Sequence, residues 1–239
     1  MSGMVTPRSR PQRPSGPRRR ASHSMEAVLN EAVSLLDEAG VPALTFRALA
    51  GRLGGGVGSI YWYVSGKDEL LDLATDHAVG PLLAELEARP DADDPIDELR
   101  TMAVRMFDAI VVRPWLAAYF MRNSLLQPNT MRLYERLGQV TLRLDLTPRQ
   151  RFHAVSAIVG YTVGTAADLG QEPPREVVDG EVGREEYLAR FADLWRGLDP
   201  EQYPFVHQIA DEFAHHDDKD QFRAGLDLLL AGLRLEAEG

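Results

Sequence analysis

The chain has 239 residues, of which 44% are hydrophobic and 26% are charged, a composition typical of a globular protein with a sizeable core. It contains no cysteine, which excludes disulfides, thiolate metal sites and a cysteine nucleophile. Its apolar runs fall short of the ~18 residues that a membrane span needs. The Arg-rich start continues into Glu26 and Asn30 rather than an apolar segment, so it does not resemble a secretory signal. We therefore expect a cytoplasmic protein without a membrane partner.

The net charge of −10 is distributed unevenly along the chain. Residues 1–67 contain nine basic and four acidic side chains, a net charge of +5, and the remainder contains 17 basic and 32 acidic side chains, a net charge of −15. A basic segment on an acidic protein is typical of a chain that binds nucleic acid at one end. A disordered basic tail on an unrelated domain would give the same asymmetry.

The first 24 residues combine four prolines, six arginines and several serines, a composition that cannot build a core. We expect residues 1–24 to form a disordered basic arm. From Met25 onward, apolar side chains recur at three- and four-residue steps, which predicts a helix that stops at Gly40 and Pro42.

The next segment predicts two short helices. Thr45 is placed to cap the first, the run Gly54–Gly56 forces a turn, and a further helix is expected over residues 57–63. Two short helices joined by a glycine turn fit a helix-turn-helix, so residues 25–67 are predicted to be a three-helix DNA-binding head.

Helical patterns continue from there to the end of the chain, and no sustained strand alternation is present. Ser65 and Asp68 have the spacing of a capping box for the next helix, in which Gly80-Pro81 predicts a kink or an end. The acidic stretch 171–186 is the best candidate for a mobile loop. We therefore predict an all-α fold, with the head joined to a larger helical body, residues 68–239.

The segment after the glycine turn carries the side chains that a recognition helix needs. Gly58 and Ser59 are small enough for the backbone to enter the major groove, and an aromatic run follows at residues 61–63. Aromatic side chains on a short helix are commonly part of the core. Three consecutive aromatics, however, cannot all point inward on a 3.6-residue period, so at least one faces solvent or a ligand.

This stretch resembles the DNA-binding domain of the tetracycline-repressor (TetR) family. The residues that match the family pattern are Leu49, Ala50, Leu53, Gly54, Gly58, Ser59, Ile60, Tyr61, Tyr63, Val64, Lys67 and Leu70. Gly55 and Gly56 depart from the pattern, because the family usually has an aliphatic and a small polar residue there. Residues 152–169 and 221–233 resemble, more weakly, the two dimerisation helices of the tetracycline-repressor branch.

The resemblance implies roles for individual residues. Thr45 and Arg47 would contact phosphate or a base edge, and the groove floor would be lined by Val57, Gly58 and Ser59. The remaining contacts, to the DNA backbone, thymine methyls and a phosphate, would come from Tyr61, Trp62, Tyr63 and Lys67. Residues 18–20, three arginines, would follow the minor groove, or else form a merely solubilising tail. The expected partner is double-stranded DNA with a near-palindromic operator.

Two segments of the body have the small and apolar residues of a helix–helix interface. Two such helices per subunit can close a four-helix bundle in a homodimer, although packing within one chain would explain the same pattern. The residues assigned to the dimer interface are Phe152, Ser156, Val159, Gly160, Val163, Gly164, Leu226, Leu229, Leu230 and Leu233.

Residues 100–165 are rich in large, adaptable apolar groups with a few polar points, which suits an effector pocket and equally a plain helical core. The residues assigned to the pocket are Met102, Met106, Phe107, Trp115, Phe120, Asn123, Tyr134, Leu137 and Thr141. In the tetracycline-binding branch a histidine in this region helps to hold the drug's magnesium. Residues 115–125 contain no histidine, so magnesium-tetracycline is not expected and the effector is unknown.

No other motif indicates chemistry. The glycine run fails the dinucleotide-binding pattern, and residues 215–218 (His-His-Asp-Asp) fit a polar loop better than a metal site. We expect no catalytic residue, metal or cofactor. The favoured function is a ligand-responsive transcriptional regulator, a repressor released from its operator by a small apolar effector, and not an enzyme. The alternatives are an all-α small-molecule-binding protein or enzyme with a basic tail, and a DNA-binding protein whose body binds a protein partner.

Overall fold

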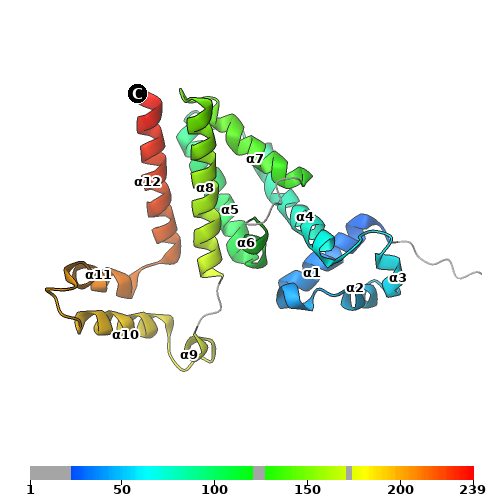
Figure 1. Cartoon of the computed structure of the whole chain (residues 1–239), viewed down its shortest axis with the longest axis horizontal. Helices are drawn as coiled ribbons and strands as arrows, with labels where there is room; N and C mark the ends of the chain where they lie inside the picture. The colour runs from blue at the N-terminus through cyan, green and yellow to red at the C-terminus, as the bar shows by residue number, and fades with distance from the viewer. Residues whose placement is uncertain (1–22, 121–126, 171–173) are drawn as a thin grey trace, which may run out of the picture.

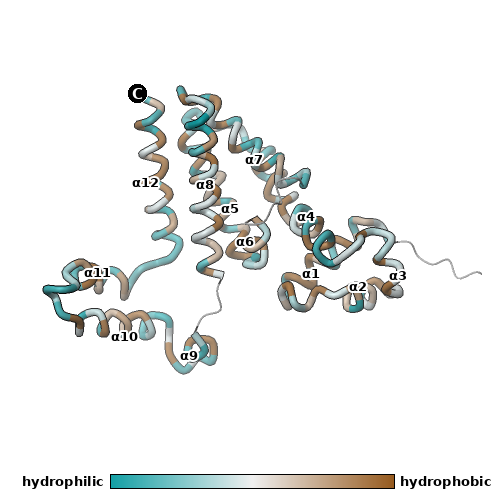
Figure 2. Tube along the Cα trace, in the orientation of Figure 1, coloured by the Kyte–Doolittle hydropathy of each residue, from teal (hydrophilic) through white to brown (hydrophobic). Residues whose placement is uncertain are grey.

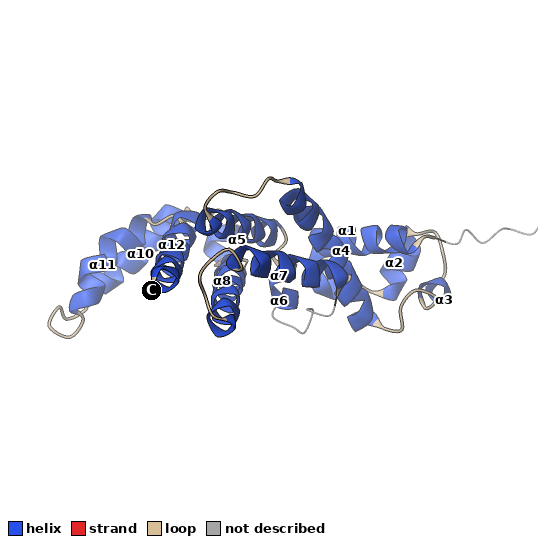
Figure 3. Cartoon of the chain, turned by 90° about the horizontal axis from the view of Figure 1, so that it is seen from above, coloured by secondary structure: helices blue, strands red, loops and turns tan. Residues whose placement is uncertain are grey.

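The computed structural model describes residues 23–120, 127–170 and 174–239, and within these residues it contains helices and no strand (Figure 3). The predicted all-α fold is confirmed. Three helices form the head: α1 (Met25–Ala43), α2 (Phe46–Arg52) and α3 (Val57–Ile60). Helix α4 (Lys67–Ala88) leads from the head into the body (Figure 1). The body continues with α5 (Pro95–Val112), α6 (Trp115–Phe120), α7 (Pro128–Thr141), α8 (Pro148–Leu169), α9 (Arg175–Val178), α10 (Arg184–Arg196), α11 (Pro204–His215) and α12 (Asp218–Glu238).

Helix α1 begins where the sequence predicts, and its regular part ends at Gly40. The hydroxyl of Ser24 accepts a hydrogen bond from the Ala27 amide at 3.0 Å and so caps the first turn. Gly40 leaves the helical conformation with φ 68° and ψ −176°, a left-handed φ that glycine adopts without steric cost. Pro42 lies in the single turn that follows, so the predicted stop at Gly40 is confirmed.

Helix α4 differs from the sequence prediction at both its start and its middle. Gly66, not Ser65, is the N-cap residue, and Glu69, not Asp68, accepts the 2.6 Å hydrogen bonds from the Ser65 amide and hydroxyl. These bonds lower the pKa of the Glu69 carboxyl. Of the kink or end expected at Gly80-Pro81, the end is wrong, because the helix continues to Ala88. Buried side chains on both sides of Pro81 hold the helix together and offset the cost of about 3 kcal/mol of an internal proline: Ala78, Val79, Leu82 and Leu83.

One apolar core runs from the head through the body to the last helix. It extends from Val28 on α1 to Leu230 on α12. Hydrophobic residues are spread along the head helices and along α4 (Figure 2). The Phe107 and Phe222 rings stack at a centroid distance of 3.9 Å and join α5 to α12. Head and body therefore share one hydrophobic core, and such a close-packed core can transmit a shift of side chains from one to the other.

Helices α10 and α11 pack on each other as a hairpin that projects away from this core, below α12 in Figure 1. Their own small cluster contains Ala192, Ala210 and Ala214, and the Trp195 and Phe213 rings pack against it. The loop predicted over residues 171–186 is wrong for the part that the structure describes as α9 and as the start of α10. The chain turns back after α9, where the Val182 amide donates to the Glu176 carbonyl at 3.0 Å and Val182 is buried. Residues 171–173 lie outside the described residues.

Two glycines of α12 differ in their surroundings, which gives a stability prediction. A Cβ atom at Gly225 would overlap the Tyr161 hydroxyl of α8, whereas a Cβ at Gly232 would meet no atom within 4 Å. We expect Gly225→Ala to lower the free energy of unfolding by about 1–3 kcal/mol through overpacking. Gly232→Ala should be neutral or stabilising by up to ~1 kcal/mol, because alanine favours the helix. Urea unfolding of both variants checks this, and equal effects would contradict the close approach of α12 to α8.

Candidate nucleic-acid interface

The helix-turn-helix of the head is built from local capping and a small buried core. The Thr45 hydroxyl accepts a hydrogen bond from the Ala48 amide at 3.1 Å and caps α2, as the sequence predicts. Gly54 then reverses the chain with φ 67°. Leu49 and Ile60 are fully buried, so α2 and α3 are fixed against each other and against the rest of the head.

Helix α3 is shorter than the predicted 57–63. It ends at Ile60, and residues 61–63 form a turn. The backbone tightens there, because the Tyr63 amide donates to the Ile60 carbonyl at 2.9 Å, an i to i+3 bond. Tyr61 still has near-helical dihedral angles of φ −63° and ψ −11°, so the turn continues the direction of the helix.

The three consecutive aromatics divide as the helical period requires. Trp62 is 89% exposed and Tyr61 is 61% exposed, while Tyr63 is half-buried and its hydroxyl donates to the His23 carbonyl. The Tyr61 ring rests edge-on against Phe46 of α2, with ring centroids 4.9 Å apart, and is held in place on the surface. The two large aromatic side chains of Tyr61 and Trp62 are therefore exposed to solvent at consecutive positions.

Other predicted DNA contacts lie on exposed parts of the same head. We call the following exposed residues the recognition surface: Thr45, Arg47, Val57, Gly58, Tyr61 and Trp62. The Thr45 oxygen already accepts from Ala48, so its own hydrogen can be donated to a phosphate. The Arg47 guanidinium has no hydrogen-bond or ion-pair partner among the residues that the structure describes. Ser59 is half-buried, and its hydroxyl donates to the Gly56 carbonyl at 2.6 Å.

The other two cations of the head have partners inside the protein. Lys67 is exposed at the start of α4, and its Nζ donates to the Val41 carbonyl at 2.9 Å. Arg52 pairs with Glu38 through both carboxylate oxygens, which lowers the pKa of the Glu38 carboxyl. With three basic and four acidic side chains, residues 25–67 have a net charge of −1. The positive charge of the segment 1–67 therefore comes from the six arginines of the arm, at positions 8–20, which lie outside the described residues.

A small cavity lies in the body between α5, α6, α7 and α8. Its volume is about 30 Å³, room for roughly one or two water molecules. It is lined by Met106, Phe120, Thr130, Leu133, Tyr134, Leu137 and Val159. None of these side chains is charged. Met106, Phe120, Tyr134 and Leu137 were assigned to a pocket by the sequence, whereas Thr130 and Leu133 were missed and Val159 was assigned to the dimer interface.

The remaining residues assigned to the pocket lie elsewhere. Phe107 stacks on Phe222 in the core. The Trp115 indole donates to the Asp37 carboxylate of α1 at 2.8 Å and so joins body to head. Among the described residues, Phe107 and Trp115 therefore connect helices of the core and do not line the cavity of about 30 Å³.

Met102 lines a separate cavity of about 40 Å³. Thr141 is fully buried and its hydroxyl donates to the Gly138 carbonyl at 2.6 Å. Asn123 lies outside the described residues.

One face of α8 is exposed and has small residues along it. Phe152 is 61% exposed, and Ser156, Gly160 and Gly164 follow it at four-residue steps on the surface. A Cβ at Gly160 or Gly164 would meet no atom within 4 Å, so no contact with the residues that the structure describes requires glycine at these positions. Leu229 and Leu233 of α12 remain partly exposed. The assignment of Val163, Leu226 and Leu230 to an intersubunit interface needs correction, because these side chains are buried in the chain's own core.

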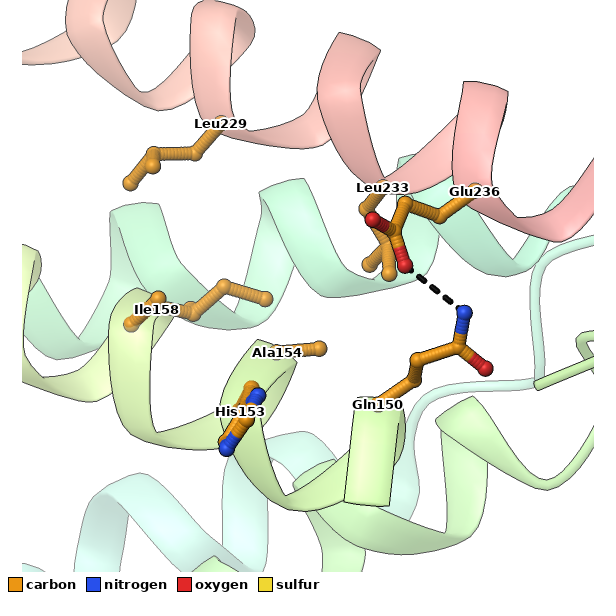
Figure 4. A pocket seen from close by; sticks show the side chains of 8 residues that line it. Gln150, His153, Ala154, Ile158, Leu229, Leu233 and Glu236 are labelled. Atoms are coloured by element: carbon orange, nitrogen blue, oxygen red, sulfur yellow. Dashed lines mark hydrogen bonds between the residues drawn. The ribbon is translucent and has the colours of Figure 1, made fainter. Parts of the chain in front are cut away.

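An apolar groove of about 220 Å³ runs between α8 and α12 (Figure 4). Ala154, Ile158 and Leu233 line it, with His153 and Leu229 beside them. Gln150 and Glu236 bridge one end, where the Gln150 amide donates to the carboxylate at 2.8 Å. The groove was not foreseen in the sequence, since its residues come from two helices that are far apart along the chain.

The described residues contain no group of three or more side chains suited to holding a metal ion. In the same part of the chain, no helix is both long and apolar enough to cross a membrane.

Comparison with known proteins agrees with this geometry. Residues 28–74 match the family described as "Bacterial regulatory proteins, tetR family", and residues 88–236 match "Tetracyclin repressor-like, C-terminal domain". The head is thus a helix-turn-helix DNA-binding domain, and the protein is a transcriptional regulator. Because the two matches together span most of the chain, the chain belongs to the tetR family, as the resemblance in its head predicts.

Several relatives extend over nearly the whole chain. The HTH-type transcriptional repressor DrrR1 of Streptomyces coeruleorubidus is 28% identical over 220 residues, 89% of this chain and 77% of DrrR1. The solved structure of SCO7222, a TetR from Streptomyces coelicolor, has 36% identity and a TM-score of 0.75, covering 90% of this chain and 99% of that one. ActR of Streptomyces coelicolor, solved in complex with actinorhodin, shares the fold at 23% identity with a TM-score of 0.76, covering 91% and 98%.

Proposed function

We propose that this protein is a homodimeric repressor that acts in the cytoplasm and leaves a near-palindromic operator when a small apolar molecule binds its body. The observation that carries the proposal is the exposure of Trp62 and Tyr61 directly after a helix whose Ile60 is fully buried. Solvent exposure of large aromatics costs hydrophobic free energy, so a binding partner for them is expected. The HTH-type repressor DrrR1 supports the repressor assignment.

A dimer is supported by the exposed face of α8. Glycine in a helix costs about 1 kcal/mol relative to alanine, and no contact with the described part of the chain offsets this cost at Gly160 and Gly164. A second helix could approach that face closely, because glycine has no side chain to keep the two backbones apart. Two-fold symmetry then presents two recognition surfaces to successive turns of the DNA, which is why the operator should be near-palindromic.

An effector site is supported by the uncharged cavity of the body. Its lining is apolar apart from the hydroxyls of Thr130 and Tyr134, so the effector should be neutral, apolar and equipped with one or two polar groups. ActR, with the same fold, was solved with actinorhodin bound.

The operator and the effector can be sought in one series of experiments. The full-length protein would be used to select duplexes from genomic fragments that include the region beside its own gene. We expect a near-palindromic site bound at least about a thousandfold more tightly than random DNA, with an affinity that falls steeply as salt rises. Neutral apolar compounds that raise the melting temperature of the protein should also release this site. Recovery of random duplexes only would overturn the proposal.

A further inference from the structure

A carboxylate on α4 caps the first turn of α7. Oδ1 of Asp76 accepts a hydrogen bond from the Thr130 amide at 2.9 Å and lies 3.2 Å from the Thr130 hydroxyl. The Asn129 side-chain amide donates to the Asp76 carbonyl at 3.1 Å. Asp76 and Thr130 are both buried, at 8% and 4% exposure, so water cannot easily replace these bonds.

Helix α7 has no cap of its own. Its N-cap residue, Gln127, makes no side-chain capping bond, and no acidic residue lies in the first turn. The amides at a helix start are unpaired and carry a partial positive charge, which a carboxylate stabilises. Asp76 supplies this negative charge from another helix, and its bonds to Thr130 fix the start of α7 to α4.

The same turn of α7 forms a wall of the cavity. Thr130 lines it, and Leu133, Tyr134 and Leu137 continue the wall along α7. At about 30 Å³ the cavity holds roughly one or two water molecules, so any larger ligand must move its walls apart. Helices α4 and α7 lie against each other, and α4 begins at the head (Figure 1).

We propose that Asp76 is a positioning residue that relays occupation of the cavity to the DNA-binding head. A ligand that enlarges the cavity shifts the first turn of α7, the Asp76–Thr130 bonds carry this shift to α4, and α4 moves the head away from the spacing of the operator. This inference rests on the proposed function, and it adds the residue through which the two sites are coupled.

Because the effector is unknown, a larger side chain introduced into the cavity serves as the probe in place of a bound ligand. Met106 lies on α5, opposite α7, and is buried against the cavity. Met106→Trp fills the cavity from within and should mimic a bound ligand. In full-length protein it should weaken binding to the selected operator about tenfold, a typical size for coupling between two sites. In an Asp76→Ala background the same substitution should weaken binding less than about twofold, because the link is gone. Asp76→Asn, whose side-chain oxygen can still accept from Thr130, should restore part of the effect.

Thr75→Val is the matched control. Thr75 is the neighbouring buried polar residue of α4, and its hydroxyl bonds only within the helix, to the Leu71 carbonyl at 2.8 Å. The Met106→Trp effect should persist at about tenfold in that background, which separates coupling from a general loss of stability. If Met106→Trp does not fold, Val159→Met replaces it, because Val159 also lines the cavity. Since the sequence assigned Val159 to the dimer interface, sedimentation must show that this variant is still a dimer.

The outcomes separate this inference from the proposed function. One outcome is that the cavity-filling variant weakens operator binding equally with Asp76 intact and in the Asp76→Ala background. That result would overturn the relay through Asp76 and leave the effector role of the cavity unaffected. An unchanged operator affinity in the cavity-filling variant with Asp76 intact would overturn both the relay and the effector role of the cavity. Failure of the unmodified protein to select any operator would overturn the proposed function itself.

Discussion

Gly160→Arg should convert the protein from a dimer to a monomer and lower its affinity for the operator about a hundredfold or more. A Cβ at position 160 would meet no atom of the described residues within 4 Å, and the position is exposed, so a long side chain can extend into solvent from one chain and should favour the helix slightly. Across a close helix–helix interface, the same side chain would hold the two copies apart. The two heads would then bind as separate molecules, and the advantage of linked binding, about 10²- to 10⁴-fold, would be lost.

Sedimentation and operator titration measure the two parts of this prediction. Gly138→Arg on α7 is the control, because Gly138 also faces open space but lies on another helix of the body. It should leave both the mass and the affinity near those of the unmodified protein. A Gly160→Arg protein that stays dimeric with unchanged affinity would contradict the placement of the interface on this face of α8.

Trp62→Ala should weaken operator binding by roughly thirtyfold without changing the stability of the protein. The side chain is 89% exposed and makes no hydrogen bond or ring contact among the described residues, so its removal creates no cavity. A lost contact of about 1 kcal/mol in each of two heads amounts to about 2 kcal/mol for the dimer. Tyr61→Ala should have a comparable effect on binding together with a loss of stability, because Tyr61 also packs on Phe46.

The control for Trp62→Ala is Leu194→Ala on α10, a side chain of the body that is 65% exposed. It should bind the operator as the unmodified protein does. Urea unfolding would confirm that Trp62→Ala and Leu194→Ala are equally stable. Unchanged operator affinity for Trp62→Ala would exclude this tryptophan from the recognition surface.

The head could be predicted in detail because its structure is determined locally. Thr45 caps the helix that follows it, and Gly54 supplies the turn through its own positive φ. The exposure of Trp62 follows from the period of a helix combined with the burial of Ile60. The length of α3 was overestimated because periodicity alone does not distinguish a final tight turn from a further helical turn.

The sequence predicted that the body is all-helical, but it did not predict which side chains contact one another there. Large apolar residues fit a pocket and a core equally well, and only the tertiary arrangement places Trp115 against Asp37 and Val163 inside the core. The continuation of α4 past Pro81 likewise depends on packing by helices distant in sequence. Asp76 gave one signal that could have been noticed: a carboxylate within an apolar helical pattern needs a partner, and the uncapped start of α7 provides it.

Binding of DNA by the recognition surface can be tested most directly by fluorine NMR of the protein labelled with fluorotryptophan. The chain contains three tryptophans, at positions 62, 115 and 195, and Trp62→Phe identifies the resonance of the exposed one. On titration with the selected operator, the Trp62 resonance should shift and reach its limit at one duplex per two chains. An unchanged Trp62 resonance in a saturated complex would contradict the account.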